Sequence, residues 1–234
     1  MAADAVSLIV PACDESGSIE GTVREAVAAF ARHGIERQEI VLVDDGSRDD
    51  TRAVMDRLGR ELPTVRVVTH DVNRGLGAAI RTGLSAAHGD ILLWVPGDGQ
   101  YAVNDLLHGL SLLDSGGVVV GLRRARGDVA RGLVSRCFHG LIFLFFRFDA
   151  SRMSGLFMIR RAVFERLRPQ SGDVFLNYEI PLLCVRHGLR VEPLDVTLHP
   201  RRSGVSKVVN ARTIGRILWE MARFRLRLWH GSDR

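Results

Sequence analysis

The feature that most constrains the fold is a regular alternation of short, mostly apolar runs with longer segments that carry apolar residues at helical spacing. Such a repeat predicts strands joined by helices, paired as a parallel sheet that is covered on both faces. The runs occupy residues 6–10, 39–43, 65–69, 91–95 and 118–121, and the helical segments about 18–32, 50–62, 76–87, 104–114, 131–146 and 211–229. We therefore expect an α/β, Rossmann-like fold whose mostly parallel sheet is flanked by helices. A chain of 234 residues is at the upper end of one domain.

The composition excludes several classes of protein. Hydrophobic residues make up 46% and charged residues 25% of the chain, which are ordinary values for a globular protein. The three cysteines form no disulfide pattern and no zinc motif, which predicts reduced thiols. The start of the chain, with Asp4 before a short and mostly apolar run at residues 6–10, does not match a signal peptide, and no run reaches the ~18 apolar residues of a spanning helix. We expect a chain that does not cross a membrane.

Positive charge is concentrated in two segments. Residues 121–136 hold five arginines against one acidic residue, and residues 210–234 hold six against two. Two local basic segments favour anionic phosphates at a site and at a surface. Nucleic acid is not expected as a partner, because no aromatic and basic stacking pattern accompanies the charge.

Polar and glycine-rich residues follow each apolar run. In a parallel sheet such segments converge on one edge, where open α/β folds bind ligands. Asp44 and Asp45, after the second run, could accept hydrogen bonds from a ribose or a base, or could form a turn that caps the next helix. Arg74, between Asn73 and Gly75, could contact a phosphate or a base, or could be a solvated surface arginine.

The fourth run ends in Pro96, two glycines, Asp98 and Gln100. A carboxylate beside flexible backbone could hold a divalent cation that bridges the diphosphate of a sugar nucleotide. The alternative is a turn in which Asp98 bonds only to nearby amides.

Four segments together resemble a known family. Residues 11–15, 43–47, 73–77 and 97–100 are similar, in order and spacing, to the landmarks of family 2 inverting glycosyltransferases with the GT-A fold. The likeness is greatest to polyprenyl-phosphate glycosyltransferases such as dolichol-phosphate mannose synthase, and it covers about residues 6–207. The resemblance implies a nucleotide-sugar site that includes Pro11, Ala12, Asp14, Glu15, Asp44, Asp45, Arg74, Gly75, Gly97, Asp98 and Gln100.

The same resemblance implies a metal site with one departure from the family pattern. Pro96 stands where the family has the first aspartate of its metal-binding motif. A Mg²⁺ or Mn²⁺ ion would then rest on Asp98, with Gln100, the diphosphate and water, which Mg²⁺ tolerates because it keeps several waters. We expect such a metal to bind weakly without the nucleotide.

Arginines in the second half extend the resemblance. Arg123 ends the fifth run, and Arg131 and Ser135 open the next helix. In the family, such residues lie against the donor diphosphate and the acceptor phosphate, and guanidinium groups neutralise these two anions. The alternative is a solvated basic face. Residues 154–157 resemble a family turn with its last two positions changed, which weakens a phosphate role there.

Two further segments have counterparts in the family. Glu179 resembles an acidic residue near the sugar, although capping of a helix is an alternative. Arg202, Ser206 and Lys207 resemble a loop that closes over the diphosphate or the acceptor phosphate, and a disordered basic loop is the alternative.

The two last helical segments have features of a membrane surface. Residues 141–146 are all apolar, which fits either burial in a core or oligomer interface or a helix that dips into a bilayer. In the last segment, Ile217, Met221, Phe224 and Leu228 share one face and arginines another, which suits an anionic membrane or a partner helix. We divide the chain into a GT-A domain, 1–209, and a basic amphipathic helix, 210–234.

These features predict inverting transfer of a sugar from a GDP- or UDP-linked donor to a polyprenyl phosphate. The phosphate oxygen is already ionised, so no general base is required. We expect a peripheral protein on the cytoplasmic face of a membrane, with a membrane-anchor protein or a second copy as a further partner. Two alternatives are a family 2 enzyme with a soluble or glycan hydroxyl acceptor, for which Glu179 is the candidate base, and a catalytically weakened module that binds a sugar nucleotide.

Overall fold

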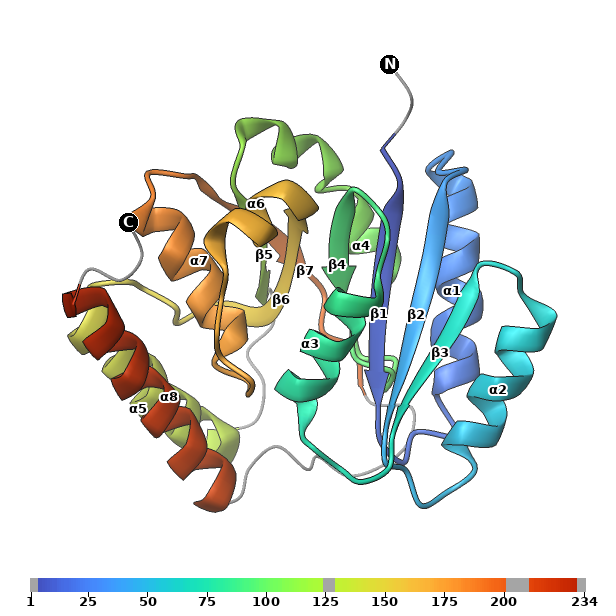
Figure 1. The fold of residues 1–234 in the computed structure, drawn as a ribbon, viewed down its shortest axis with the longest axis horizontal. Helices are drawn as coiled ribbons and strands as arrows, with labels where there is room; N and C mark the ends of the chain where they lie inside the picture. Colours follow the sequence, from blue (N-terminus) through green and yellow to red (C-terminus); the bar gives the residue numbers. More distant parts are fainter. Residues whose placement is uncertain (1–3, 124–128, 201–210, 231–234) are drawn as a thin grey trace.

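A computed structural model describes residues 4–123, 129–200 and 211–230, and Figure 1 shows their arrangement. Within these residues, seven strands form one sheet in the order β3-β2-β1-β4-β6-β5-β7. Every pairing is parallel except those of β6, which is antiparallel to β4 and β5. The strands are β1 (Val6–Ala12), β2 (Gln38–Asp45), β3 (Val65–His70), β4 (Ile91–Trp94), β5 (Val118–Arg123), β6 (Met153–Arg160) and β7 (Val191–Val196).

Helices cover both faces of this sheet. In Figure 1, α3, α6 and α7 lie in front of the strands, whereas α1 and α4 lie behind them. The chain order reverses direction at β1, so right-handed crossovers place α1 and α2 on one face and α3 on the other. The helices are α1 (Ile19–Arg32), α2 (Thr51–Glu61), α3 (Leu76–Ala86), α4 (Val103–Leu107), α5 (Val129–Phe146), α6 (Arg161–Leu167), α7 (Leu176–Arg186) and α8 (Ala211–His230), with a 3₁₀ turn, η1 (Leu110–Ser115).

The expected α/β fold and the five predicted strands are confirmed, and two local expectations need correction. The helix expected over 104–114 is two short elements, α4 and η1, separated near Gly109. Residues 154–157, expected as a turn, lie within β6, where Gly155 has a φ of +89° beside an irregularity in the pairing with β5. Strands β6 and β7 were not predicted.

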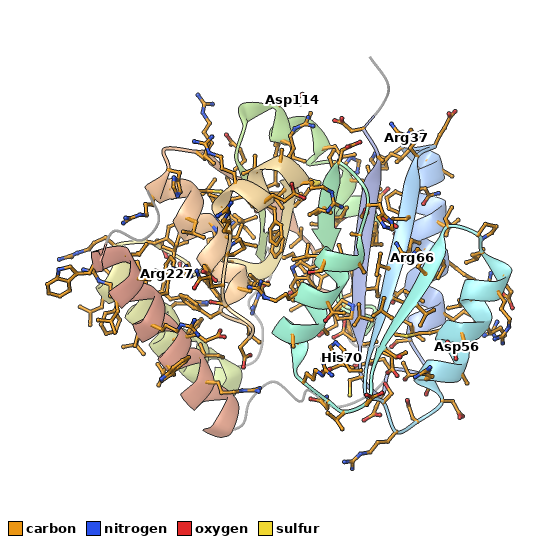
Figure 2. All side chains as sticks on the ribbon, in the orientation of Figure 1. Arg37, Asp56, Arg66, His70, Asp114 and Arg227 are labelled. Carbon is orange, nitrogen blue, oxygen red and sulfur yellow. The ribbon has the colours of Figure 1, made fainter. Side chains whose placement is uncertain are left out.

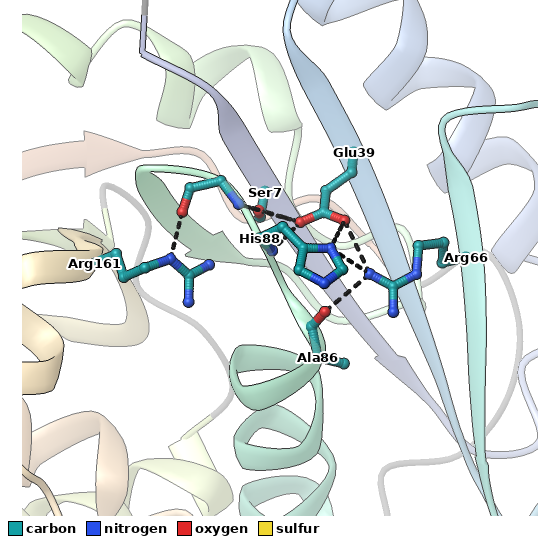
Figure 3. Close-up of polar contacts among 7 residues, drawn as sticks. Ser7, Glu39, Arg66, Ala86, His88 and Arg161 are labelled. Atoms are coloured by element: carbon teal, nitrogen blue, oxygen red, sulfur yellow. Dashed lines mark hydrogen bonds and ion pairs between the residues drawn. The ribbon is translucent and has the colours of Figure 1, made fainter.

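Hydrogen bonds of Glu39 close the amino end of the sheet (Figure 3). The carboxylate of Glu39, at the start of β2, accepts a hydrogen bond from Ser7 Oγ at 2.6 Å and others from the amides of His88 and Gly89. Arg66 Nη1 lies 3.3 Å from its second oxygen. Burial alone would raise the pKa of Glu39, but these hydrogen bonds outweigh it and the pKa is lowered. The edge opposite the acidic loops is therefore fixed by side chains.

Helices α5 and α8 pack together beside α7 (Figure 1). The ring of Phe224 on α8 lies 5.5 Å from that of Phe146 on α5 and 5.7 Å from that of Phe175, just before α7. Met221 and Phe224 are buried. The central part of the apolar face predicted for the last helix therefore packs on other helices of the same chain.

A different set of apolar side chains faces outward from these two helices. Phe143, Leu144 and Phe145 of α5 and Leu218, Trp219, Leu226 and Trp229 of α8 are exposed. In the described part of the chain, no helix combines the length and the apolar character needed to cross a membrane.

Candidate functional site

The loops that follow β1, β2, β3 and β4 meet at one edge of the sheet, as predicted. Strand pairing sets Ala12 opposite Asp44 and Asp45 opposite His70. The amide of Gly97, after β4, donates to the carbonyl of Pro11 at 3.0 Å. Figure 2 shows His70 at this edge, where β1, β2 and β3 end. Residues that lie far apart in the sequence are thus brought into one site.

Residues 11–15 form the centre of this edge through both backbone and side chains. Asp14 has a φ of +55°, and its carboxylate accepts a hydrogen bond from the amide of Arg48 at 2.6 Å. The amide of Glu15 donates to Thr51 Oγ1 at 2.7 Å, and Ser18 Oγ donates to the Glu15 carboxylate at 3.1 Å. Both predicted acidic residues therefore connect the loop after β1 to neighbouring segments.

Asp44 and Asp45 end β2 with buried side chains. Asp44 Oδ1 accepts from the amide of Ser47 at 3.1 Å, which is the local turn given as the alternative above. Asp45 instead reaches β3 and the following loop, because its carboxylate accepts from His70 Nδ1 and from the amides of Arg74 and Gly75. The two neighbouring carboxylates thus have different partners.

The loop between β3 and α3 projects toward the loop after β1. Asn73 Nδ2 lies 3.1 Å from Cys13 Sγ, and Arg74 is exposed. Gly75 precedes α3 with a φ of +95°, a conformation that favours glycine. Arg216 of α8 also reaches this place, since a Cβ added at Gly75 would lie 3.2 Å from its Nη2. The loop therefore brings basic groups to the edge from two parts of the chain.

Asp98 follows β4 and is 3% exposed. Its Oδ1 accepts from the amide of Gln100 at 3.0 Å. The carbonyl of Gln100 accepts from the amide of His199 at 2.8 Å, so the segment after β7 crosses this loop. Side chains of the described residues form no group of three or more potential metal ligands of the His, Cys, Asp and Glu types. Asp98 thus provides a single carboxylate, with Gln100 beside it, for any cation.

Arg123, at the end of β5, connects Asp98 to a group of aromatic side chains. Its guanidinium acts on the phenol of Tyr101. Burial raises the pKa of Tyr101, Arg123 opposes this effect, and the charge of Asp98 adds to it, which places both charged groups close to this phenol.

The aromatic group continues across α5 and α7. Burial raises the pKa of Tyr178 to about 12, and burial with the nearby Arg123 lowers the pKa of His139. His139 Nε2 lies 3.4 Å from the Tyr178 hydroxyl. Sequence reasoning missed Tyr101, His139 and Tyr178. The position of Tyr101 directly after the Asp98 loop was the one available signal.

Glu179 is fully buried at the start of α7. Its carboxylate accepts from the amides of Gln170 at 2.9 Å and Ser171 at 2.7 Å and pairs with Arg227 of α8. Figure 2 shows Arg227 where α8 approaches α7. Residues 170 and 171 lie in the loop between α6 and α7, so Glu179 holds this loop and Arg227 and does not cap a helix.

The segment of residues 168–175 is held between α3 and α8. A Cβ at Gly77 of α3 would overlap the backbone of Asp173. From the other side, Glu220 of α8 accepts from the amide of Gly172 at 2.8 Å, and Arg216 Nε lies 2.9 Å from Asp173 Oδ2. Helix α8 is thereby connected to α3 through backbone and side chains.

The side chains of the remaining predicted site residues lie outside the part of the chain that the structure describes. Arg131 and Ser135 fall on α5, but their side chains lie outside the described residues. Arg202, Ser206 and Lys207 belong to residues 201–210, which also lie outside. What the structure brings together is an edge with two acidic loops, a glycine turn before a helix, and arginines from β5 and α8. Such an edge can bind a polar, phosphorylated ligand.

Comparison with known proteins identifies relatives of this chain. The family model described as "Glycosyl transferase family 2" matches residues 7–168. The glycosyltransferase AglD of Haloferax volcanii is 31% identical over 220 residues, which are 89% of this chain and 35% of that protein. The dolichyl-phosphate beta-glucosyltransferase of Saccharomyces cerevisiae is 25% identical over 83% of this chain and 66% of that protein. The chain thus spans between about a third and two thirds of the length of these curated relatives.

A solved structure supports the fold. Glucosyl-3-phosphoglycerate synthase from Mycobacterium tuberculosis, in complex with Mn²⁺, uridine diphosphate and phosphoglyceric acid, superposes with a TM-score of 0.70 at 22% identity. The superposition covers 95% of this chain and 79% of that one. The mostly parallel, helix-flanked sheet therefore has the expected GT-A arrangement, and the chain belongs to glycosyl transferase family 2.

Proposed function

We propose that the protein transfers a sugar, with inversion at the anomeric carbon, from a GDP- or UDP-linked donor to a polyprenyl phosphate at a membrane surface. The observation that carries the proposal is the convergence of the four acidic and glycine-rich loops at one edge, with Asp98 and Arg123 both acting on the phenol of Tyr101. Family membership supports the transfer of a sugar. The printed name of the yeast relative, a dolichyl-phosphate glucosyltransferase, supports the lipid acceptor.

The nucleotide of the donor lies against residues 11–15, 44–47 and 73–75 in this proposal. An oxygen of the acceptor phosphate attacks the anomeric carbon, the bond from that carbon to the diphosphate breaks, and the nucleoside diphosphate leaves with the electron pair. Arg123 neutralises phosphate charge, and Arg131, Ser135, Arg202, Ser206 and Lys207 complete the proposed set. Catalysis is then mainly positioning and electrostatic stabilisation of the leaving group.

Asp98 and Gln100 fit a weakly held divalent ion. Asp98 has one carboxylate oxygen engaged by the Gln100 amide, and Pro96 supplies no ligand. Mg²⁺ is bound in many nucleotide sites by one or two carboxylates together with substrate phosphates. When bound, Mg²⁺ or Mn²⁺ would neutralise the diphosphate of the leaving group.

The exposed side chains of α5 and α8 support a lipid surface. Trp219 and Trp229 are exposed beside arginines of the same helix, and Arg223 lies over the ring of Trp219 at 5.5 Å. Aromatic and basic side chains on one helix suit the interface of an anionic bilayer. The proposal therefore includes peripheral attachment at the cytoplasmic face, with an anchor protein or a second copy as a further partner.

The contacts of Glu179 favour this acceptor over a hydroxyl acceptor. A hydroxyl nucleophile needs a base close to the anomeric carbon. Glu179, the candidate base, is buried against two amides and Arg227. A phosphate acceptor has no such requirement.

Transfer of label to a lipid tests the proposal. Radiolabelled UDP- and GDP-sugars are incubated with the protein, Mg²⁺ and a short-chain polyprenyl phosphate, and the product is extracted into organic solvent. We expect label in the organic phase that depends on both protein and polyprenyl phosphate, and that is lost in D98A. Label that stays aqueous with every donor, while free sugars become glycosylated, would assign the protein to a hydroxyl acceptor instead.

A further inference from the structure

A buried chain of hydrogen bonds lies beneath the loop between β3 and α3. His70 ends β3 opposite Asp45, and its Nδ1 lies 2.8 Å from Asp45 Oδ1. Its Nε2 lies 2.9 Å from Thr82 Oγ1 on α3. The side chains of His70 and Asp45 are 4% and 5% exposed. Both ring nitrogens are thus engaged inside the protein, away from water.

Asp45 extends this chain to the loop itself. Besides His70, its carboxylate accepts from the amide of Arg74 at 2.8 Å and from that of Gly75 at 2.9 Å. Holding two successive amides fixes the direction in which this part of the loop runs. The neighbouring Asn73 contacts Cys13, and the Arg74 side chain is exposed at the site edge. The placement of both side chains therefore depends on the orientation of the Asp45 carboxylate.

A second contact shows how closely the loop is fitted. Gly46, directly after Asp45, has a φ of +66°, and a Cβ there would lie 2.6 Å from the backbone nitrogen of Asn73. The loop thus rests on the backbone of residue 46 while its amides bind Asp45. Small rotations of the Asp45 carboxylate would be transmitted to the loop, because the close approach of Gly46 to Asn73 leaves no space to absorb the change.

We propose that His70 is a positioning residue for the nucleotide of the donor. Its Nδ1–H holds Asp45 in the orientation that binds the amides of Arg74 and Gly75, and its Nε2 contact with Thr82 fixes the ring relative to α3. His70 does not touch the ligand. The identity of that ligand rests on the proposed function, whereas the effect on the loop does not.

Three substitutions distinguish the roles of the two ring nitrogens of His70. In H70N the side-chain amide takes the place of Nδ1 and keeps a donor for Asp45, whereas in H70Q the amide reaches the place of Nε2 and this donor is lost. H70L removes both. H88L is the control, because the exposed His88 also contacts a carboxylate, the partly buried Glu39, but at the opposite edge of the sheet (Figure 3).

Two measurements are made on the full chain. Amide hydrogen exchange of Arg74 and Gly75 is followed by NMR, and the Kd of UDP and of GDP is measured by calorimetry with Mn²⁺ present. Loss of a hydrogen bond to a charged group predicts at least about tenfold faster exchange and about tenfold weaker nucleotide binding in H70L and H70Q. H70N and H88L should stay within about threefold of the unsubstituted protein. A purely structural role would lower the folded fraction and leave the Kd of the folded molecules unchanged.

Several outcomes would overturn the proposal: unchanged exchange in H70Q, an unchanged nucleotide Kd despite faster exchange, or H70N as impaired as H70L. If H70L does not fold, the comparison of H70N with H70Q decides. If the unsubstituted protein binds neither nucleotide while exchange changes as expected, the proposed function fails, and His70 retains its effect on the loop but not its role in binding.

Discussion

Phe224 and Trp229 lie on the same helix, and their replacement by alanine should have opposite consequences. Phe224 is 2% exposed and contacts the rings of Phe146 and Phe175. Removing a buried phenylalanine costs about 3–5 kcal/mol in the free energy of unfolding. Trp229 is 80% exposed, so W229A should change that free energy by less than about 0.5 kcal/mol. Chemical unfolding followed by circular dichroism measures both.

Membrane affinity should fall in W229A and stay unchanged in F224A. A tryptophan presents about 200 Å², and insertion of half the exposed part of Trp229 at about 25 cal/mol per Å² would give about 2 kcal/mol. W229A should therefore reduce partitioning onto anionic vesicles about thirtyfold, whereas folded F224A should partition normally. Cosedimentation with vesicles containing phosphatidylglycerol measures this, with neutral phosphatidylcholine vesicles as the control. A loss of stability below about 1 kcal/mol in F224A would refute the packing of α8, and unchanged partitioning of W229A would refute its contact with lipid.

Three further predictions concern the metal, a buried ion pair and acid stability. Manganese titrations should show at least about tenfold tighter binding with UDP or GDP than without, and D98N should abolish the difference; tight binding to nucleotide-free protein would contradict the sparse site. R227L should lower the free energy of unfolding by about 3–5 kcal/mol, because it leaves the buried carboxylate of Glu179 without its cation. A smaller loss in the E179Q/R227L double variant than in R227L would confirm that the two side chains are coupled. The pKa of Glu39 is lowered in the folded state, so its ionised carboxylate stabilises the fold above its unfolded pKa, near 4.3. This stabilisation is lost as the pH falls through the folded pKa. Thermal unfolding of E39Q should therefore show a weaker fall in stability between pH 6 and pH 3 than that of the unsubstituted protein.

The sequence was sufficient for the parts of the fold where burial is continuous. Strands β1, β2 and β4 are buried along nearly their whole length, and each contains a run of at least three consecutive apolar residues. Strand β7 lies at the edge of the sheet and contains Glu192, Pro193 and Asp195, which hides it from a search for apolar runs. In β6, Ser154 and Gly155 interrupt the pattern at the irregular pairing. The missed strands are thus those in which polar residues, proline or glycine interrupt the apolar pattern.

The site was predicted at the level of loops and not of individual bonds. Parallel pairing brings the loops after β1 to β4 together, so their convergence followed from the strand order alone. The partners of Asp45 and Glu179 did not follow, because His70 lies 25 residues from Asp45 and Arg227 lies 48 residues from Glu179. A carboxylate in a sequence looks the same whether its acceptor positions face a ligand or a distant part of the same chain.

The connection of α8 to α3 through residues 172–173 has a geometric consequence for the proposed lipid acceptor. Glu220 and Arg216 join α8 to this segment, and Gly77 leaves no space between the segment and α3. A bilayer that received the exposed side of α8 would therefore be held at one height and one tilt relative to the first turn of α3. The phosphate of a membrane-embedded acceptor would meet the sugar at a distance set by the protein's rigid frame, and a lengthened or shortened segment at 168–175 would displace the two reactants from each other while leaving each bound.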